Sequence, residues 1–532
     1  MSTPPNQPPD PAPTVPGLRV WPAALIAVLA AAALFKIQVL DREAAFQHRN
    51  LATAAVALLT FTALLLWWTL LSRAPRRQRR IALAAVTGLM VLSGVLFRIR
   101  GVSGDFVPIW EPRWSRTAAP AAVVVPSVSA PAPTGSAPGI VGETFPQFLG
   151  PNRNGRIAGP SLDTRWAVQP PVIAWRQPVG PAWSGFVVAG GYAVTQEQQG
   201  AEEQVTAYDR ASGRRLWTHA DPERYATTIA GEGPRATPAL QDGRVFSLGA
   251  TGRLNALDLA TGRLLWTRSL TADAACSVPE WGFSGSPLVH EGLVVVSAGG
   301  REGASMIAYR ADSGELAWKA GDSGAGYASP FLATLSGTPQ ILILNHRSFA
   351  SHDPATGAVR WEVPFGAGLP LVANPIETGP DRVLISAGYN VGAELFAVGP
   401  GTHAPTSLWK SRKLKAKFAN PVYRDGHVYG LDDGILVCLD VRDGSQPWKE
   451  GRYGHGQGLL VNDLYLLMAE SGEMVLLRPT PEGPNELGRL RIFNSKTWNP
   501  IALAGADLLV RNDQEAALVR LPLATSAPAS TP

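Results

Sequence analysis

A short pattern that returns along most of the chain constrains its fold more than any other feature of the 532-residue sequence. Most copies contain an aspartate, then a serine or threonine followed by glycine, and a tryptophan at the end. The clearest copies end at Trp217, Trp266, Trp318, Trp361 and Trp448, and a looser copy ends at Trp409. A repeat with a period of about 40 to 50 residues indicates a stack of small, similar structural units.

Each unit has the pattern of a four-stranded antiparallel sheet. In residues 233–267, short runs of alternating apolar and polar residues are separated by Asp242-Gly243, Thr251-Gly252 and Thr261-Gly262. Glycine supplies the positive φ that tight hairpin turns need. The closing tryptophan offers a large flat surface on which the next sheet can pack. Four-stranded sheets repeated around an axis form a β-propeller.

The number of units predicts eight blades. Seven units lie between Gly185 and about Leu490, and the stretch from Trp498 to Leu523 supplies only three more strands. An isolated strand, residues 172–175, has the right ending but no unit before it. We therefore predict an all-β propeller of eight four-stranded antiparallel blades over residues 143–524, in which strand 172–175 completes the last blade. Such closure removes exposed sheet edges.

The pattern Asp-x-x-Ser/Thr-Gly-x-x-x-Trp resembles the tryptophan-docking repeat of the quinoprotein alcohol dehydrogenase-like superfamily. The run from Phe145 to Gly155 also resembles the opening motif of bacterial PQQ-like β-propeller repeat proteins, which are named after pyrroloquinoline quinone (PQQ). The resemblance covers about residues 143–524. It implies the propeller fold and leaves the chemistry open. The superfamily holds dehydrogenases and also non-catalytic scaffolds, such as the propeller lipoprotein of the outer-membrane β-barrel assembly machinery.

Three apolar stretches precede the propeller, at residues 21–40, 51–71 and 81–97. Each is about 17 to 21 residues long, which is enough helix to cross a hydrocarbon core of about 30 Å. Five arginines lie between Arg73 and Arg80, and a short basic loop is typical of the cytoplasmic side of a membrane. We therefore expect a multi-pass anchor of three transmembrane helices within residues 18–100, in a bacterial inner (cytoplasmic) membrane. The N-terminus would then be cytoplasmic and the propeller periplasmic.

The remaining segments and the charge distribution agree with this organisation. Residues 1–17 and 525–532 are expected to be disordered tails, and residues 101–142 form a juxtamembrane segment followed by an Ala/Pro linker. Thirteen of the 47 Lys and Arg residues, but only five of the 42 Asp and Glu residues, lie in residues 1–116. The basic character therefore belongs to the anchor. We expect the lipid bilayer as a partner and no nucleic acid.

A candidate binding surface lies where the innermost strands of the blades begin. Six of these starts have Thr, Ser or Asn followed by proline, and they should meet at one mouth of the propeller channel. The candidate residues at this mouth are Arg235, Trp281, Tyr327, Asn374, Lys417, Asn420, His455 and Trp498. One interpretation is that the short polar residues only bond the turns and a water-filled channel. The other is that the rim binds a flat anionic ligand, such as PQQ, or an extended peptide.

The resemblance also implies what a catalytic member contains: a disulfide between adjacent cysteines, a calcium ion held by Glu and Asn, and an Asp base. The sequence has only Cys276 and Cys438, which are not adjacent. The nearest carboxylates, Glu197, Glu280 and Asp322, match no catalytic motif of the family. We therefore assign no catalytic residue and no metal ligand, and PQQ with calcium stays an alternative cofactor.

Two functions are compatible with these residues. The first is a non-catalytic, membrane-anchored extracytoplasmic propeller that binds or scaffolds an envelope protein or peptide at its mouth. The missing dehydrogenase features favour it. The second is a membrane-bound PQQ-dependent dehydrogenase that oxidises an alcohol or sugar in the periplasm. Fold alone does not decide between them.

Overall fold

The computed structural model describes residues 18–41, 45–114, 143–401 and 404–524. The chain separates into two compact units, Met1–Thr117 and Ala118–Pro532. The tails expected at residues 1–17 and 525–532, and the Ala/Pro linker up to residue 142, lie outside the described residues.

The first unit contains three helices that are long and apolar enough to cross a membrane. They are α1 (Trp21–Phe35) with its π-helical end η1 (Lys36–Leu40), α2 (Phe46–Leu66) with η2 (Trp67–Leu71), and α3 (Arg76–Leu96). Four of the five arginines expected in a loop belong to the start of α3 instead. Arginine is a good helix former, and Pro75 disfavours helical backbone at the residue before it, so the helix begins just after the proline.

A β-hairpin that the sequence did not predict follows α3 directly. It consists of β1 (Phe97–Val102) and β2 (Pro108–Pro112), which pair antiparallel with Ile99 opposite Trp110. Aromatic and β-branched residues favour such pairing. The segment treated as a plain juxtamembrane stretch therefore has its own secondary structure.

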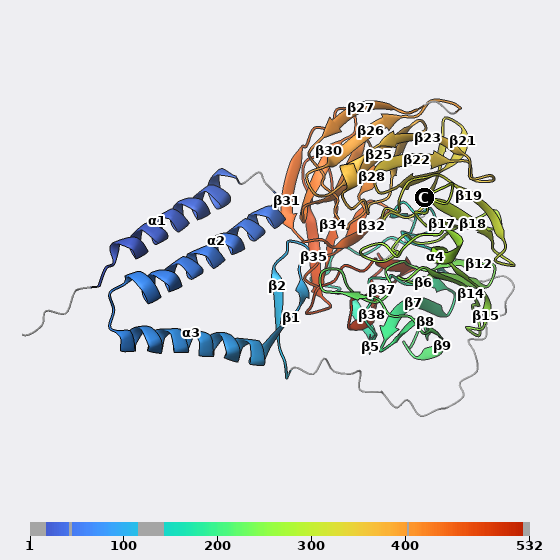
Figure 1. Cartoon of the computed structure of the whole chain (residues 1–532). Coiled ribbons are helices and arrows are strands. Elements are labelled where there is room, and N and C mark those ends of the chain that lie inside the picture. The colour runs from blue at the N-terminus through green and yellow to red at the C-terminus, as the bar shows by residue number, and fades with distance from the viewer. Residues whose placement is uncertain (1–17, 42–44, 115–142, 402–403, 525–532) are drawn as a thin grey trace, which may run out of the picture. The chain divides into compact units, whose positions relative to one another are not determined.

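The second unit is a ring of eight blades, and Figure 1 shows the colours running round it from teal to red. Each blade is an antiparallel sheet of four strands, with the first strand innermost, as predicted. The strands of blades 1–4 are β6 (Val187–Ala189), β7 (Tyr192–Gln199), β8 (Glu202–Asp209) and β9 (Arg215–Asp221); β12 (Ala239–Gln241), β13 (Arg244–Leu248), β14 (Arg253–Asp258) and β15 (Leu264–Ser269); β16 (Leu288–His290), β17 (Leu293–Ser297), β18 (Met306–Arg310) and β19 (Leu316–Ala320); β20 (Phe331–Leu335), β21 (Thr338–Leu344), β22 (Ser348–His352) and β23 (Val359–Pro364).

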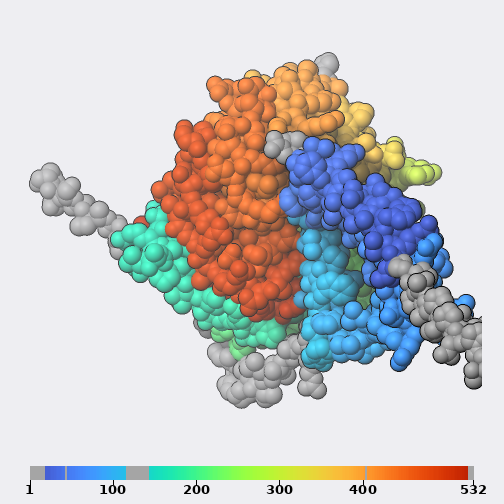
Figure 2. All heavy atoms as spheres, turned by 90° about the vertical axis from the view of Figure 1, so that its left-hand side faces the viewer, coloured from blue at the N-terminus to red at the C-terminus, as the bar shows by residue number. Residues whose placement is uncertain are grey.

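The other four blades are built in the same way, and Figure 2 shows the orange-to-red part of the chain as one continuous surface. Their strands are β24 (Ile376–Gly379), β25 (Arg382–Ala387), β26 (Gly392–Ala397) and β27 (Thr406–Ser411); β28 (Val422–Arg424), β29 (His427–Asp432), β30 (Ile435–Asp440) and β31 (Trp448–Arg452); β32 (Gln457–Val461), β33 (Leu464–Met468), β34 (Glu473–Leu477) and β35 (Glu486–Arg491); β36 (Ala502–Ala504), β37 (Asp507–Arg511), β38 (Glu515–Arg520) and β5 (Val172–Pro178). Short elements between blades are β10 (Ala226–Thr227), β11 (Gly231–Glu232), α4 (Leu270–Asp273) and η3 (Gly366–Gly368).

The ring closes through the strand that the sequence left without a unit. Strand β5 pairs antiparallel with β38, and Trp175 lies opposite Leu518. The last blade therefore combines three strands from the end of the propeller with one from its beginning. This confirms the predicted closure. The last blade has its fourth strand, so β38 does not present an open sheet edge.

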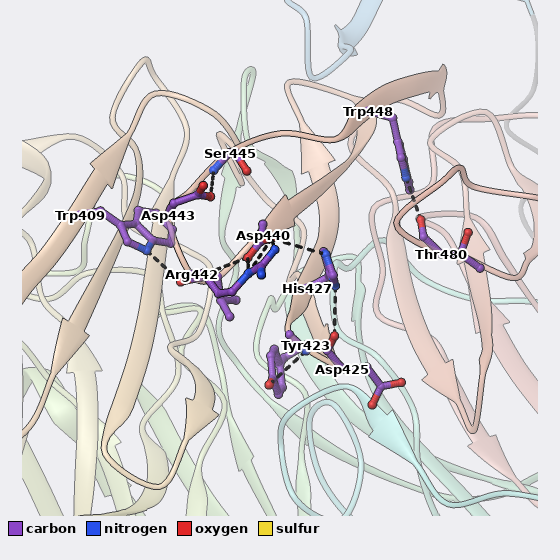
Figure 3. Close-up of polar contacts among 12 residues, drawn as sticks. Trp409, Tyr423, Asp425, His427, Asp440, Arg442, Asp443, Ser445, Trp448 and Thr480 are labelled. Atoms are coloured by element: carbon purple, nitrogen blue, oxygen red, sulfur yellow. Dashed lines mark hydrogen bonds and ion pairs between the residues drawn. The ribbon is translucent and has the colours of Figure 1, made fainter.

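Neighbouring blades are joined by the closing tryptophans. Trp217 donates its indole N–H to the carbonyl of Leu259 in the next blade at 2.9 Å, and Trp448 donates to Thr480 at 2.8 Å. Figure 3 shows the equivalent bond from Trp409, 2.9 Å to the carbonyl of Val441, beside Asp440 and Arg442. Each bond satisfies a buried indole donor while the ring covers the neighbouring turn.

The glycine of each repeat is required by this contact. At Gly262 the backbone φ is +73°, and a Cβ atom would lie 2.4 Å from the ring of Trp217. The glycines at 213, 314, 357 and 444 have the same positive φ and lie against the tryptophan of the preceding blade. Glycine therefore fits for two reasons, its left-handed backbone and the absence of a side chain under the indole.

Blade 7 lacks a closing tryptophan, and Gly488 stands in its place. Trp166, from the segment before β5, is only 4% exposed and lies against Gly488, where a Cβ would be 2.8 Å from the tryptophan Cβ. The N-terminal segment thus fills the gap that the repeat leaves.

The opening motif, residues 145–155, lies in the propeller channel. Strand β3 (Thr144–Phe145) pairs with β6, and β4 (Arg156–Ile157) pairs in parallel with β32. Between them, Pro146 accepts a hydrogen bond from Leu240 of β12. Because β6, β12 and β32 are innermost strands of three blades, the segment lies across the axis. The segment around residues 145–155 therefore occupies part of the channel. One expectation had been that the channel is filled with water.

Replacing Gly262 by alanine should destabilise the propeller more than replacing Gly243. Both glycines have positive φ, +73° and +71°, but a Cβ at Gly243 would meet nothing within 4 Å. The Gly243→Ala change should cost about 1 to 2 kcal/mol, the penalty of a left-handed alanine. The Gly262→Ala change should add about 1 to 3 kcal/mol from overpacking against Trp217. Denaturant unfolding of the two variants, followed by tryptophan fluorescence, measures this difference, and equal losses would contradict the docking account.

Candidate functional site

A ring of short polar side chains joins the starts of the innermost strands. Each side chain accepts a hydrogen bond from a backbone N–H of the preceding blade. The pairs, with the donor nitrogen first, are Gly185 to Thr237 Oγ1 at 3.0 Å, Thr237 to Ser286 Oγ at 2.9 Å, Ser286 to Ser329 Oγ at 2.9 Å, Ser329 to Asn374 Oδ1 at 3.0 Å and Asn374 to Asn420 Oδ1 at 2.8 Å. Asn499 of blade 8 continues the ring by donating to the carbonyl groups of Ala182 and Ser184.

Two of the candidate site residues belong to this ring. Asn374 and Asn420 are 3% and 5% exposed, and their amide oxygens bind backbone N–H groups. Satisfying buried backbone donors is a structural task. The structure therefore places both asparagines where they hold adjacent blades together, which is a structural role.

Arg153 reaches this ring from the channel segment. Its side chain donates to the carbonyl groups of Ser286 and Pro287 at 2.9 and 2.8 Å, and to the side chain of Gln147. The residue is 2% exposed, and burial lowers the pKa of its guanidinium to about 9. All three acceptors are neutral oxygens, so the contact fixes the channel segment without an ion pair.

The mouth above the ring carries one aromatic ring from each blade or from the loop leading into it. These are Trp183, Tyr225, Trp281, Tyr327, Tyr389, Phe418, His455 and Trp498. All except His455 are partly exposed. Residues before an innermost strand, and the turn between second and third strands that holds Tyr389, lie at the same end of a blade because consecutive strands alternate in direction. We call this set the rim.

On one side of the rim the rings contact one another directly. The centroid of Trp498 lies 5.0 Å from that of Trp183 and 4.9 Å from that of Phe418, and Phe418 lies 5.4 Å from His455. The rings are tilted by 42° to 61°. Glu470 supports this side, since it accepts a hydrogen bond from the Trp498 indole at 3.0 Å and from the His455 backbone at 2.9 Å.

Two lysines lie over these rings. The ammonium nitrogen of Lys496 is 4.0 Å from the centroid of Trp498 and 4.7 Å from that of Trp183. Lys417, 3% exposed, is 5.1 Å from Tyr389 and 5.4 Å from Phe418. Such cation–π contacts hold the ammonium groups against the aromatic faces.

The other side of the rim centres on Arg235. Its guanidinium lies 4.3 Å from the ring of Tyr225 and donates to the carbonyl groups of Ala230 and Gly231 in the loop that carries β10 and β11. Burial lowers the pKa of Arg235 to about 10. Trp281 and Tyr327 stack on each other nearby, with centroids 5.4 Å apart and planes 28° apart.

A buried carboxylate lies close to this side. Glu203 of β8 is 5% exposed and accepts a hydrogen bond from the backbone N–H of Ala250 at 3.0 Å. Burial raises the pKa of Glu203 to about 7, and the neighbouring Arg235 charge limits the rise while Glu223 and Asp221 add to it.

Four of the eight candidate residues, Trp281, Tyr327, His455 and Trp498, therefore belong to the rim. Arg235 and Lys417 lie against its rings, and the two asparagines belong to the ring below it. The sequence reasoning did not identify Tyr225, Tyr389, Lys496, Glu203 or Glu470 as part of this region. Lys496 could have been found, because it lies two residues before Trp498. Tyr389 and Glu470 lie in turns between the second and third strands, which the search of the strand starts did not cover.

The carboxylates considered for calcium have structural partners. Glu197 is fully buried and accepts hydrogen bonds from the Gly180 backbone at 2.6 Å and the Thr206 hydroxyl at 2.7 Å. Asp322 accepts one from the Gly303 backbone at 2.6 Å. Within the described part of the chain, no group of three His, Cys, Asp or Glu residues could hold a metal ion. Calcium binds through several oxygen ligands with carboxylate charge, and Glu197 and Asp322 already use carboxylate oxygens to accept hydrogen bonds within the protein.

A groove of about 510 Å³ lies between blades 4 and 5. It is lined by Arg347, Phe365, Val391, Glu394 and Lys410, among others. Lys410 and Glu394 form an ion pair across it at 3.1 Å. Most of its polar character is thus paired within the protein.

Comparison with known proteins gives a family match within the propeller. Residues 201–450 match the family model described as outer membrane protein assembly factor BamB, a PQQ-type repeat model. No curated protein matches the chain. Among solved structures, the quinohemoprotein alcohol dehydrogenase from Comamonas testosteroni has a TM-score of 0.51 at 14% identity, over 73% of this chain and 82% of that one.

Two further structures are similar. The quinohemoprotein alcohol dehydrogenase ADHIIG from Pseudomonas putida HK5 has a TM-score of 0.51 at 12% identity, again over 73% and 82% of the two chains. BamB from Moraxella catarrhalis has a TM-score of 0.47 at 14% identity, over 66% of this chain and 99% of that one. At these identities the two dehydrogenases show a shared fold, and the predicted PQQ-like repeats are confirmed by the family match.

Replacing Glu203 by glutamine should remove a pH dependence of stability. The folded-state pKa of about 7 lies above the ordinary glutamate value of 4.5, so the folded protein holds a proton that the unfolded chain releases. Wild-type stability should therefore fall as the pH rises from about 4.5 through 7. Relative to Glu203→Gln, the loss between pH 5 and pH 8 should be about 2 to 3 kcal/mol.

Denaturant unfolding at the two pH values measures this effect. The exposed neighbour Glu202 provides the control, since Glu202→Gln should keep the wild-type pH dependence. A Glu203→Gln variant with the same pH dependence as the wild type would show that the carboxyl is not held protonated by burial.

Proposed function

We propose that this protein, whose propeller is built from PQQ-like repeats, is a membrane-anchored extracytoplasmic scaffold that binds a protein or peptide segment at the rim. The supporting observation is the rim itself. Eight rings and three cationic side chains, Arg235, Lys417 and Lys496, converge on one mouth of the channel. Tryptophan, tyrosine and arginine are the residues most enriched where proteins bind one another.

The form of the rim favours a surface contact over a deep binding slot. The rings of Trp183, Trp498 and Phe418 already contact one another at 4.9 to 5.0 Å, which is direct ring contact. A flat cofactor inserted between two of them would need rings about 7 to 8 Å apart, the thickness of two van der Waals contacts. Seven of the rings are partly exposed, so an extended peptide can lie across them.

A scaffold role also agrees with the way the channel is filled. The segment around Arg153 crosses the axis, and the ring of Thr, Ser and Asn side chains is used for bonds between blades. These groups hold the rim loops in place and are not directed at a ligand. Rigid support of this kind lowers the entropy cost of binding.

The membrane part of the proposal rests on the helices and the arginines. The three helices have mean hydropathies of 2.3, 2.0 and 1.6 in their most apolar windows. Arg76, Arg77, Arg79 and Arg80 lie at the start of α3, and such a cluster favours the cytoplasmic side. The end of α3 and the propeller would then lie outside, in the periplasm if the cell has two membranes.

Site-specific crosslinking in cells tests the proposed partner contact. A photo-crosslinking amino acid at Trp281, Tyr327 or Trp498 should give the same adduct with one envelope protein. The rim places all three within one surface. The measurement is the mass of the adducts after irradiation, followed by identification of the partner.

The opposite end of the propeller supplies the control. Arg442, whose side chain is 83% exposed, and Asp425, 84% exposed, lie in turns at that end. Crosslinkers there should not give the rim adduct. Equal adducts from both ends, or none from the rim, would reject the rim as the binding surface.

The alternative is a PQQ-dependent dehydrogenase, and it has its own test. We expect no calcium-dependent binding of PQQ to the purified full-length protein in calorimetry, because the carboxylates of Glu197 and Asp322 already accept hydrogen bonds within the protein. Tight binding that Trp498→Ala abolishes, while Arg442→Ala retains it, would overturn the scaffold proposal and establish a quinone site at the rim.

A further inference from the structure

The hairpin β1–β2 presents one apolar and one charged face. In its register Phe97 lies opposite Pro112 and Ile99 opposite Trp110, so these four side chains share a face. On that face Ile99 is 47% exposed and Trp110 is 60% exposed. Trp114, 64% exposed, adds its ring at 6.1 Å from Phe97. Isolated exposed apolar residues are common, but a continuous face of this kind marks a contact surface.

The other face is polar and internally paired. Arg98 lies opposite Glu111 and forms an ion pair with it, and Arg100 approaches the same carboxylate at 3.7 Å. The charged side chains are thus separated from the apolar ones by the plane of the hairpin. Such a division fits a boundary between water and an apolar phase.

Three hydrogen bonds hold the hairpin against the ends of two helices. The backbone and the side chain of Arg113 donate to the carbonyl groups of Leu96 and Gly94 at the end of α3, both at 2.8 Å. Asn50, in the first turns of α2, donates to the carbonyl of Asp105 at the hairpin tip, at 2.9 Å. Both ends of the hairpin are therefore fixed at the same end of the helix bundle.

We propose that the apolar face of this hairpin binds the lipid bilayer, lying in the headgroup region of the leaflet next to the propeller. The proposal rests on the membrane-spanning role proposed above for α2 and α3. If those helices cross the bilayer, the hydrogen bonds to Leu96 and Gly94 leave the hairpin no position away from the bilayer surface. The lipid surface is therefore the occupant that the geometry selects for the exposed face.

The chemistry of the hairpin agrees with the headgroup region and not with the hydrocarbon core. Only helices and closed barrels span the hydrocarbon core, so a two-stranded hairpin belongs outside it. Tryptophan prefers the boundary, where its ring is apolar and its N–H reaches water. The Arg98–Glu111 pair would face the aqueous side. The hairpin would then set the depth at which the anchor sits in the bilayer.

Spin-label accessibility in the full-length protein tests this placement. The background variant is Cys276→Ser, which leaves only Cys438, a fully buried thiol whose pKa burial raises to about 12. Nitroxide labels are attached to Ile99→Cys, Trp110→Cys, Leu59→Cys and Arg442→Cys in turn. Each protein is placed in nanodiscs of phosphatidylethanolamine and phosphatidylglycerol. Collision rates with oxygen, which enters lipid, and with a nickel chelate, which stays in water, are then measured.

The labels at positions 99 and 110 should have an oxygen-to-nickel ratio several-fold above that at position 442 and below that at position 59. Leu59 is 68% exposed in the middle of α2 and reports insertion of the helix itself. A lipid signal at position 59 with an aqueous signal at positions 99 and 110 would overturn the hairpin proposal and leave the anchor intact. An aqueous signal at position 59 would overturn both.

A second variant separates lipid contact from the effect of the label. Adding Trp110→Asp to the Ile99→Cys protein should lower the ratio at position 99 several-fold, because a carboxylate on the apolar face opposes burial in the interface. The ratio at position 59 should stay unchanged. An unchanged ratio at position 99 would count against the proposal.

Discussion

The contact on which the propeller depends is an indole ring lying over a glycine in the next blade. Trp217 over Gly262 is the pattern: the indole N–H binds the carbonyl of Leu259, and the absent side chain of the glycine makes room for the ring. The same contact recurs at Gly213, Gly314, Gly357 and Gly444, so it joins five of the eight pairs of neighbouring blades. The ring of Thr, Ser and Asn side chains performs the same task at the inner end of the blades. Adjacent sheets are therefore joined both at their tryptophans and at the starts of their innermost strands. The loops at the mouth are attached to this rigid frame.

Most of the fold could be predicted because the docking contact is encoded locally. Asp258, Gly262 and Trp266 lie within nine consecutive residues. Each copy of this pattern therefore predicts one blade. Strand β5 was assigned to the last blade because Trp175 carries the same ending. The channel segment and Trp166 were not predicted. Their partners lie in several different blades, from β6 to β35, and such contacts leave no periodic signal in the sequence. The β1–β2 hairpin was missed because it occurs once and follows a helix without a break.

The sequence predicted where most candidate residues lie, but it did not predict what their side chains contact. The rule that strand starts meet at one mouth brought Arg235, Trp281, Tyr327 and Trp498 to the rim. It could not separate side chains that point at a ligand from those that bond a neighbouring blade, because Asn374 and Asn420 share the same sequence context as their neighbours. Lys417 shows the same ambiguity, since it is buried over Tyr389 and Phe418. The chemistry of the rim depends on these contacts, which only the packed structure defines.

The closure of the last blade has a consequence for synthesis. Arg176 of β5 and Glu515 of β38 bond to each other across 339 residues of chain. At about 5 to 20 residues per second, a ribosome needs roughly 20 to 70 s to make the second strand after the first. During that interval β5 has no partner and the growing sheets form an open arc. A newly made chain therefore has a long period in which its first strand can pair with another molecule, and shielding of that strand until the final blade emerges would decide the yield of closed rings.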